Sequence, residues 1–200
     1  MEHKKLISDR TYQQKIKSYL KDAWEAVSGT DQDFTTGSLG RAIFLLSLPM
    51  VLEMIMESVF AVVDIWFVSR LGADAIATVG ITESLITIVY AIAVGLSMAT
   101  AALVARRIGE KKRDAAVNAA FQGILAGFLA SLLIAVPGAF YARELLILMG
   151  ISEAIAAEMS AYTAIMLGSN TVIMLLFVIN SVFRSAGDAA ISMRVLWLAN

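Results

Sequence analysis

The sequence predicts an all-α fold, a polytopic transmembrane helix bundle. Of its 200 residues, 58% are hydrophobic and only 16% are charged, a balance well outside the range of soluble domains. The charged residues also gather between long apolar runs, each of which exceeds the roughly 20 residues that cross about 30 Å of hydrocarbon. These observations indicate an integral membrane protein.

The predicted bundle occupies residues 39–200 and contains four full spans. Each apolar run is longer than the bilayer requires, so the helices are expected to tilt or protrude. A fifth apolar stretch of about 12 residues is too short to cross, and the chain is expected to end within that helix. The spans are predicted at about 42–69, 75–105, 115–141 and 155–183, and the fifth stretch at 189–200.

Two further signals concern the third span. Gly123 and Gly127 form a small-x-x-x-small pair, which lets neighbouring helices approach closely. Pro137 lies near the end of this span and, because proline lacks the N–H of a helical residue, it is expected to end the helix.

The segment 1–38 is charged and lacks the apolar core of a signal peptide, so it is predicted to be a cytoplasmic N-terminal segment. Within it, apolar residues from Leu6 to Val27 recur at roughly helical spacing among lysines. This pattern predicts an amphipathic helix on the membrane surface. A solvated, partly helical tail is the alternative.

The cations predict the orientation. If the N-terminus is cytoplasmic, 14 of the 16 Lys and Arg residues lie on the inner side, and only Arg70 and Arg143 lie outside. Because Lys and Arg near span ends stay in the cytoplasm, we expect a multi-pass protein of the plasma membrane with an inner N-terminus.

Three carboxylates stand out in the first span. Glu53, Glu57 and Asp64 are four and seven residues apart, so on an α-helix they fall within about 40° of each other around the axis. Charges inside a span are costly and mark ion or substrate pathways. Acids that are protonated or hydrogen-bonded only to fix helix packing are the alternative.

Three other residues join the predicted substrate cavity. Glu83 in the second span either faces the same cavity or lies at the interface. Met54 places a flexible thioether beside the acids, which suits a promiscuous binding surface as well as ordinary apolar filling. Asn180 in the fourth span either lines the cavity or links helices.

The polar chemistry of the spans favours exchange of cations. No Lys or Arg lies deep in a span, so the carboxylates can take up and release a proton, Na⁺ or a cationic substrate. The sequence has no cysteine and no G-x-x-x-x-G-K-[ST] motif, so it contains no thiolate metal site and no phosphate loop for ATP. Any transport is therefore expected to be secondary, and the protein is not expected to be an enzyme.

Four short motifs carry a family resemblance from about residue 38 to 200. They are Leu48-Pro49 followed by VDIWFVSRLGADA (63–75); GLS (95–97) leading to ARRIG (105–109); LMG (148–150) before Tyr162; and FRSAGD (183–188). In this order and spacing they resemble the N-terminal part of multidrug and toxic compound extrusion (MATE) transporters, covering four spans and the start of the fifth.

The resemblance implies efflux of drugs or other amphipathic, often cationic compounds by H⁺ or Na⁺ antiport, through alternating access between two lobes. It implies cation or proton binding at Asp64, which matches the family's first-span aspartate. Glu53 and Glu57 are not reliably acidic in the family, so their role rests on their shared helix face with Asp64 and on the cost of charges inside a span. No cofactor besides the coupling ion is expected, and a possible Na⁺ at Asp64 is the one metal candidate.

The implied partners are the lipid bilayer, small organic substrates and a C-terminal lobe, with no nucleic acid. The family's N-x-x-x-D element in the fifth span would begin just after Asn200, so the chain is expected to be a fragment that is inactive alone. Two alternatives stay open: a lipid-linked oligosaccharide flippase of the same superfamily, which would be expected to carry basic residues in its cavity, and a non-transporting membrane scaffold whose acids hold partner helices.

Overall fold

The computed structural model describes residues 17–18, 20–29 and 38–199, and in this part of the chain the regular structure is helical. The predicted all-α class is therefore confirmed. Residues 20–28 are helical, but much of the predicted surface helix from Leu6 to Val27 lies outside the described residues, so that assignment stays a prediction. The chain divides into two compact units, Met1–Met56 with Gly187–Asn200, and Glu57–Ala186.

The first unit is held together by ionic and hydrogen-bonding contacts of two arginines. Arg41 pairs with Asp22 at 3.1 Å and with Glu25 at 2.8 Å. Arg194 donates hydrogen bonds to the carbonyl oxygens of Val27, at 3.1 Å, and Ser28. These contacts tie the helix at residues 20–28 to the other helical parts of the unit, which are the first part of α2 (Leu39–Val68) and α8 (Ala189–Ala199).

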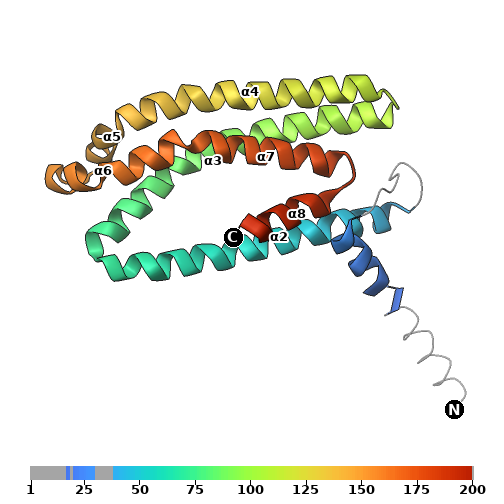
Figure 1. Ribbon diagram of the computed structural model, residues 1–200, viewed down its shortest axis with the longest axis horizontal. Helices are drawn as coiled ribbons and strands as arrows, with labels where there is room; N and C mark the ends of the chain where they lie inside the picture. Colours follow the sequence, from blue (N-terminus) through green and yellow to red (C-terminus); the bar gives the residue numbers. More distant parts are fainter. Residues whose placement is uncertain (1–16, 19, 30–37, 200) are drawn as a thin grey trace, which may run out of the picture. The chain divides into compact units, whose positions relative to one another are not determined.

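The second unit is a bundle in which α3, α4 and α7 lie side by side (Figure 1). The short α5 packs against α6 at the end of the bundle away from the turn between α3 and α4. Besides the rest of α2, the unit contains η1 (Ser69–Leu71), α3 (Ala73–Gly109), α4 (Arg113–Phe140), α5 (Ala142–Leu148), α6 (Glu153–Gly168) and α7 (Asn170–Ser185).

Four helical stretches of the described chain are long and apolar enough to cross a membrane, which agrees with a polytopic bundle. The last of them is divided, because α6 ends at Gly168 and α7 begins at Asn170. The stretches are Leu39–Leu71, Ala73–Gly109, Arg113–Phe140 and Glu153–Ser185.

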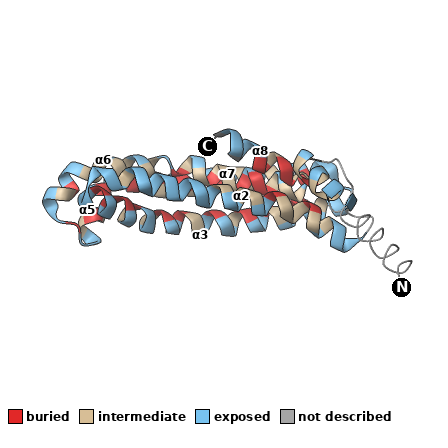
Figure 2. Ribbon diagram, turned by 90° about the horizontal axis from the view of Figure 1, so that it is seen from below, coloured by how far each residue is buried: buried red, intermediate tan, exposed pale blue. Residues whose placement is uncertain are grey.

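The interior of the second unit combines apolar and small polar side chains. Val89, Ala93 and Met174 form a buried cluster, and Figure 2 shows buried residues recurring along α3 with exposed residues between them. The Oγ1 atoms of Thr82 and Thr163 lie 2.8 Å apart in a buried hydrogen bond between α3 and α6. Helices in membranes pack in this way, through close contact and a few interhelical hydrogen bonds.

The close approach predicted at Gly123 and Gly127 is confirmed. A Cβ atom added at Gly123 would lie 2.4 Å from the Oγ1 atom of Thr100 on α3. At Gly127 it would lie 3.3 Å from Val178 on α7. The absence of a side chain at Gly123 therefore sets how near α4 comes to α3.

Two features differ from the expectations. Pro137 does not end its helix, because α4 continues to Phe140 and the N–H of Tyr141 donates to the Pro137 carbonyl at 2.9 Å. Proline removes only its own N–H donor, so the turn that follows it can still form. The helix α5 was not anticipated, since its seven residues are too few to show a clear period.

Candidate functional site

The candidate site begins with Glu57 and Asp64, which belong to the second-unit part of α2. The two residues are seven apart and therefore share one face of the helix. Every residue from Glu57 to Phe67 is exposed. The acids of this part of α2 are therefore on the surface and are not buried in the bundle.

The connection after α2 brings in a third carboxylate. The three-residue η1 and Gly72, whose φ of 106° lies in the left-handed region that favours glycine, reverse the chain before α3 begins at Ala73. Glu83, on the third turn of α3, is then close enough to Asp64 for their charges to interact. The charges of Asp64 and Glu83 thus act on each other, while the choice between a cavity and an interfacial position for Glu83 stays a prediction.

Two tyrosines complete this acidic cluster, which we define as Glu57, Asp64, Glu83, Tyr90 and Tyr162. Tyr90 on α3 interacts electrostatically with Glu83 and Glu57, and Tyr162 on α6 with Glu83 and Asp64. Both tyrosines are half-buried. Sequence reasoning missed them as site residues, although Tyr90 follows Glu83 by seven residues, the same spacing that groups Glu57 with Asp64.

The acidic cluster lacks compensating cations among the described residues, where none of its three carboxylates forms an ion pair. Arg70, the cation nearest along the chain, instead places its guanidinium over the Trp66 ring, 3.8 Å from the centroid. In the same described ranges, no group of three or more acidic, His or Cys side chains is arranged to hold a metal ion.

The remaining predicted site residues lie elsewhere. Glu53, which is half-buried, and Met54, which is 65% exposed, belong to the first-unit part of α2. Asn180 is buried in α7, at 6% exposure. All three have interactions of their own, and their assignment to a substrate cavity stays a prediction.

A basic cluster forms at the other end of α3. Glu110, directly after the helix, accepts hydrogen bonds from Arg106 at 3.0 Å and Arg107 at 2.9 Å, and its carboxylate lies 3.2 Å from the Lys112 ammonium. These bonds, that from Arg107 foremost, lower the pKa of Glu110 to about 2. The Glu110 carboxylate thus forms ion pairs with three cations at the turn between α3 and α4.

The fold and the acidic cluster define the class of the protein, a multi-pass membrane protein with an acidic site on its helices. The MatE family model matches residues 49–200. The chain therefore belongs to the MatE family, whose members are transporters.

Relatives of known sequence agree with this assignment. The "FAD transporter" of Shewanella oneidensis is 25% identical over 161 residues, which cover 80% of this chain and 36% of the relative. The "Probable multidrug resistance protein YoeA" of Bacillus subtilis is 25% identical over 153 residues, which cover 76% of this chain and 33% of the relative. The chain spans about a third of the length of the relatives it matches.

Solved structures resemble the chain over a similar range. A transporter of the MOP superfamily from Pyrococcus furiosus superposes with a TM-score of 0.74 and 28% identity, covering 80% of this chain and 35% of that one. The crystal structure of MATE in complex with MaD3S gives a TM-score of 0.77 and 27% identity, over 81% and 36% of the two chains. The membrane fold predicted from the sequence is thus shared with transporters.

Proposed function

We propose that the protein is a secondary active antiporter that exports drugs or other amphipathic organic compounds, many of them cationic, in exchange for H⁺ or Na⁺. The observation that carries this proposal is the acidic cluster, where Asp64 and Glu83 interact without an ion pair among the described residues. Carboxylates in this state bind a proton, a metal cation or a cationic substrate, and these ligands compete for the same charge. Competition of this kind is the basis of exchange.

The roles within the site follow from position. Asp64 binds the coupling cation or proton, and its charge acts on both Glu83 and Tyr162. Glu57 and Glu83 attract the positive charge of the substrate, and we assign Asn180 to the lining of its path. The cation bias of the sequence supports a cytoplasmic N-terminus, and we assign the protein to the plasma membrane.

The test is transport by the full-length protein in proteoliposomes, with ethidium as the cationic probe and with a proton or a sodium gradient imposed separately. We expect one gradient to drive ethidium movement, and Asp64→Asn to abolish it. Asp74→Asn is the matched control, because Asp74 is an exposed aspartate in the first turn of α3 and lies outside the acidic cluster. Gradient-driven transport that survives in Asp64→Asn would refute the assigned role.

FAD is a second candidate substrate, because one relative is named a FAD transporter. The same assay should therefore also measure FAD uptake. FAD is anionic at neutral pH, so an unpaired acidic cluster disfavours it electrostatically. Uptake of FAD in preference to ethidium would overturn the cationic substrate class and leave the transporter class in place.

A further inference from the structure

A pocket of about 420 Å³ lies where the end of α3, the start of α4 and the end of α7 meet. Its volume falls within the range of pockets that hold small ligands, about 300 to 1,000 Å³. Its wall is almost wholly apolar, with two cations at the rim. The lining residues are Val104, Ile108, Lys111, Arg113, Ala116, Val117, Ala120, Val182 and Ala186.

This pocket is separate from the acidic cluster. Val104 follows Glu83 by 21 residues along α3, which corresponds to about 30 Å of helix. The two sites therefore lie toward opposite ends of the bundle and carry opposite charge.

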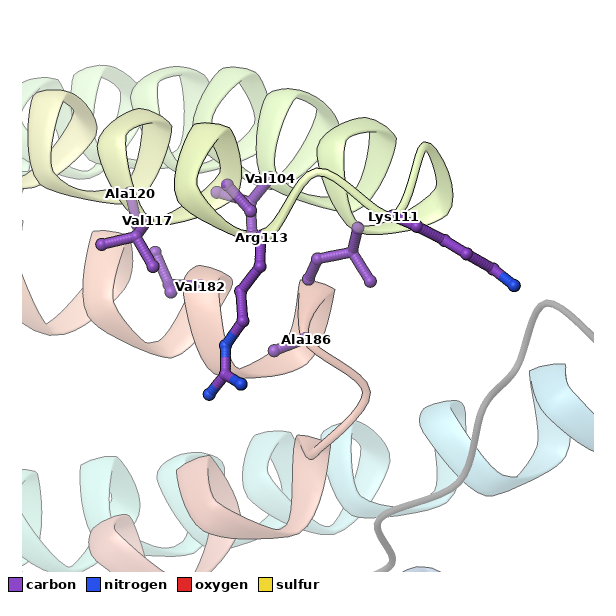
Figure 3. A pocket seen from close by; sticks show the side chains of 9 residues that line it. Val104, Lys111, Arg113, Val117, Ala120, Val182 and Ala186 are labelled. Carbon is purple, nitrogen blue, oxygen red and sulfur yellow. The ribbon is translucent and has the colours of Figure 1, made fainter.

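The charge at the rim is available to a ligand. Two acids flank these cations in the sequence: Glu110 is already bonded to Arg106, Arg107 and Lys112, and Asp114, in the first turn of α4, forms no ion pair among the described residues. Among the described residues, Lys111 and Arg113 have no ion pair, and both are exposed. Figure 3 shows the Arg113 side chain crossing the pocket toward the end of α7, whereas Lys111 extends away from it.

We propose that this pocket binds an anionic glycerophospholipid, with the phosphate at Arg113 and an acyl chain against Val104, Val117 and Val182, while Lys111 adds positive charge at the rim. A free anion would gain nothing from the apolar wall, and an uncharged lipid would gain nothing from the cations. Basic pockets between membrane helices are suited to anionic lipid head groups. The start of α4 adds unpaired backbone N–H groups, since no side chain caps it.

The test is native mass spectrometry of the purified full chain in detergent micelles, titrated with palmitoyl-oleoyl phosphatidylglycerol and, separately, with the matching phosphatidylcholine. We expect preferential retention of phosphatidylglycerol. The double variant Lys111→Ala/Arg113→Ala is expected to weaken its binding by about fivefold for each cation removed. Ala120→Phe, which fills the apolar wall, is expected to weaken binding of the same lipid with the cations intact.

The matched control is Arg143→Ala, which removes an exposed arginine of α5 at the other end of the bundle and should leave retention unchanged. Circular dichroism checks that each variant keeps its helices, and the surface variant Lys111→Ala/Arg113→Ala carries the test if Ala120→Phe does not fold. Equal retention of the two lipids, equal effects of the double variant and Arg143→Ala, or displacement of the lipid by inorganic phosphate would each overturn the proposal. None of these outcomes depends on transport.

Discussion

The second-unit part of α2 and the interior formed by α3, α4 and α7 have similar apolar composition but opposite surroundings. From Glu57 to Phe67 no residue of α2 is buried. On α7, by contrast, Met174 and Val178 are fully buried. Hydropathy identifies both as membrane segments and does not distinguish them.

The difference lies in the polar residues that each region carries. The packed interior holds hydroxyl groups and glycines that bond or fit across helices, such as Thr82 with Thr163 and Gly123 with Thr100. The exposed part of α2 holds carboxylates without ion pairs among the described residues. Small polar groups are typical of contacts between membrane helices, whereas charged groups within spans are costly unless they have a functional or pairing role.

The largest difference in stability between the two regions is expected when one apolar side chain is shortened in each of them. Met174→Ala should lower the free energy of unfolding by about 2–5 kcal/mol, because it opens a cavity at a residue with 0% exposure. Val62→Ala on α2, at 71% exposure, should change it by no more than about 0.5 kcal/mol. Unfolding in mixed micelles followed by circular dichroism measures both, and equal losses would contradict the contrast.

A smaller effect is expected from adding one methyl group. Gly123→Ala should cost about 1–3 kcal/mol, because the new Cβ would collide with the side chain of Thr100. Gly95→Ala on α3 is the control, since no atom lies within 4 Å of its added Cβ, and alanine favours the helix by about 1 kcal/mol. Thr100→Ala combined with Gly123→Ala should recover part of the loss, and a double-mutant cycle that shows no coupling would count against this packing.

The smallest expected change in stability comes from replacing a carboxylate, and it should differ between Glu110, which has ion pairs, and Glu57, which has none among the described residues. Glu110→Gln should lower the melting temperature at neutral pH by removing three ionic contacts. The change should be modest, because the carboxylate is only half-buried and water screens its charge. The folded-state pKa of about 2 is below the ordinary 4.5, so the stabilisation is complete above about pH 4.5 and is lost as the pH falls toward 2.

The difference between the Glu110→Gln variant and the unaltered protein should therefore narrow in melting scans from pH 7 to pH 3. Glu57→Gln is the control on α2, where no ion pair among the described residues is removed. A difference that stays constant over this range would show that the contacts of Glu110 do not stabilise the folded chain.

Sequence periodicity predicts contacts along one helix well. The shared face of Glu57 and Asp64 follows from the helical repeat alone. The small-x-x-x-small pair at Gly123 and Gly127 predicted that a helix comes close, but not that Thr100 of α3 is the neighbour. Contacts between helices were harder to predict. The approach of Glu83 to Asp64 depends on the geometry of η1, and that of Tyr162 on how α6 packs.

The division of the fourth apolar stretch was also outside the reach of hydropathy, because Ser169 lies between apolar segments and introduces no charge. The side chain of Asn170, at 0% exposure, donates to the Leu167 carbonyl at 2.6 Å and so satisfies an acceptor near the break. In the sequence, the break between α6 and α7 is marked only by a run of small and amide residues, Gly168-Ser169-Asn170.

The three-residue η1 has one more consequence, which concerns rotational phase. A helix turns by about 100° per residue, so the length of the connection decides which side of α3 faces Asp64. With η1 at Ser69–Leu71, Glu83 lies within range of the charge of Asp64. One residue inserted there would keep both spans and their hydropathy, yet is expected to turn Glu83 toward a different neighbour. The acidic cluster is thus encoded in the length of a turn as well as in the identity of its acids.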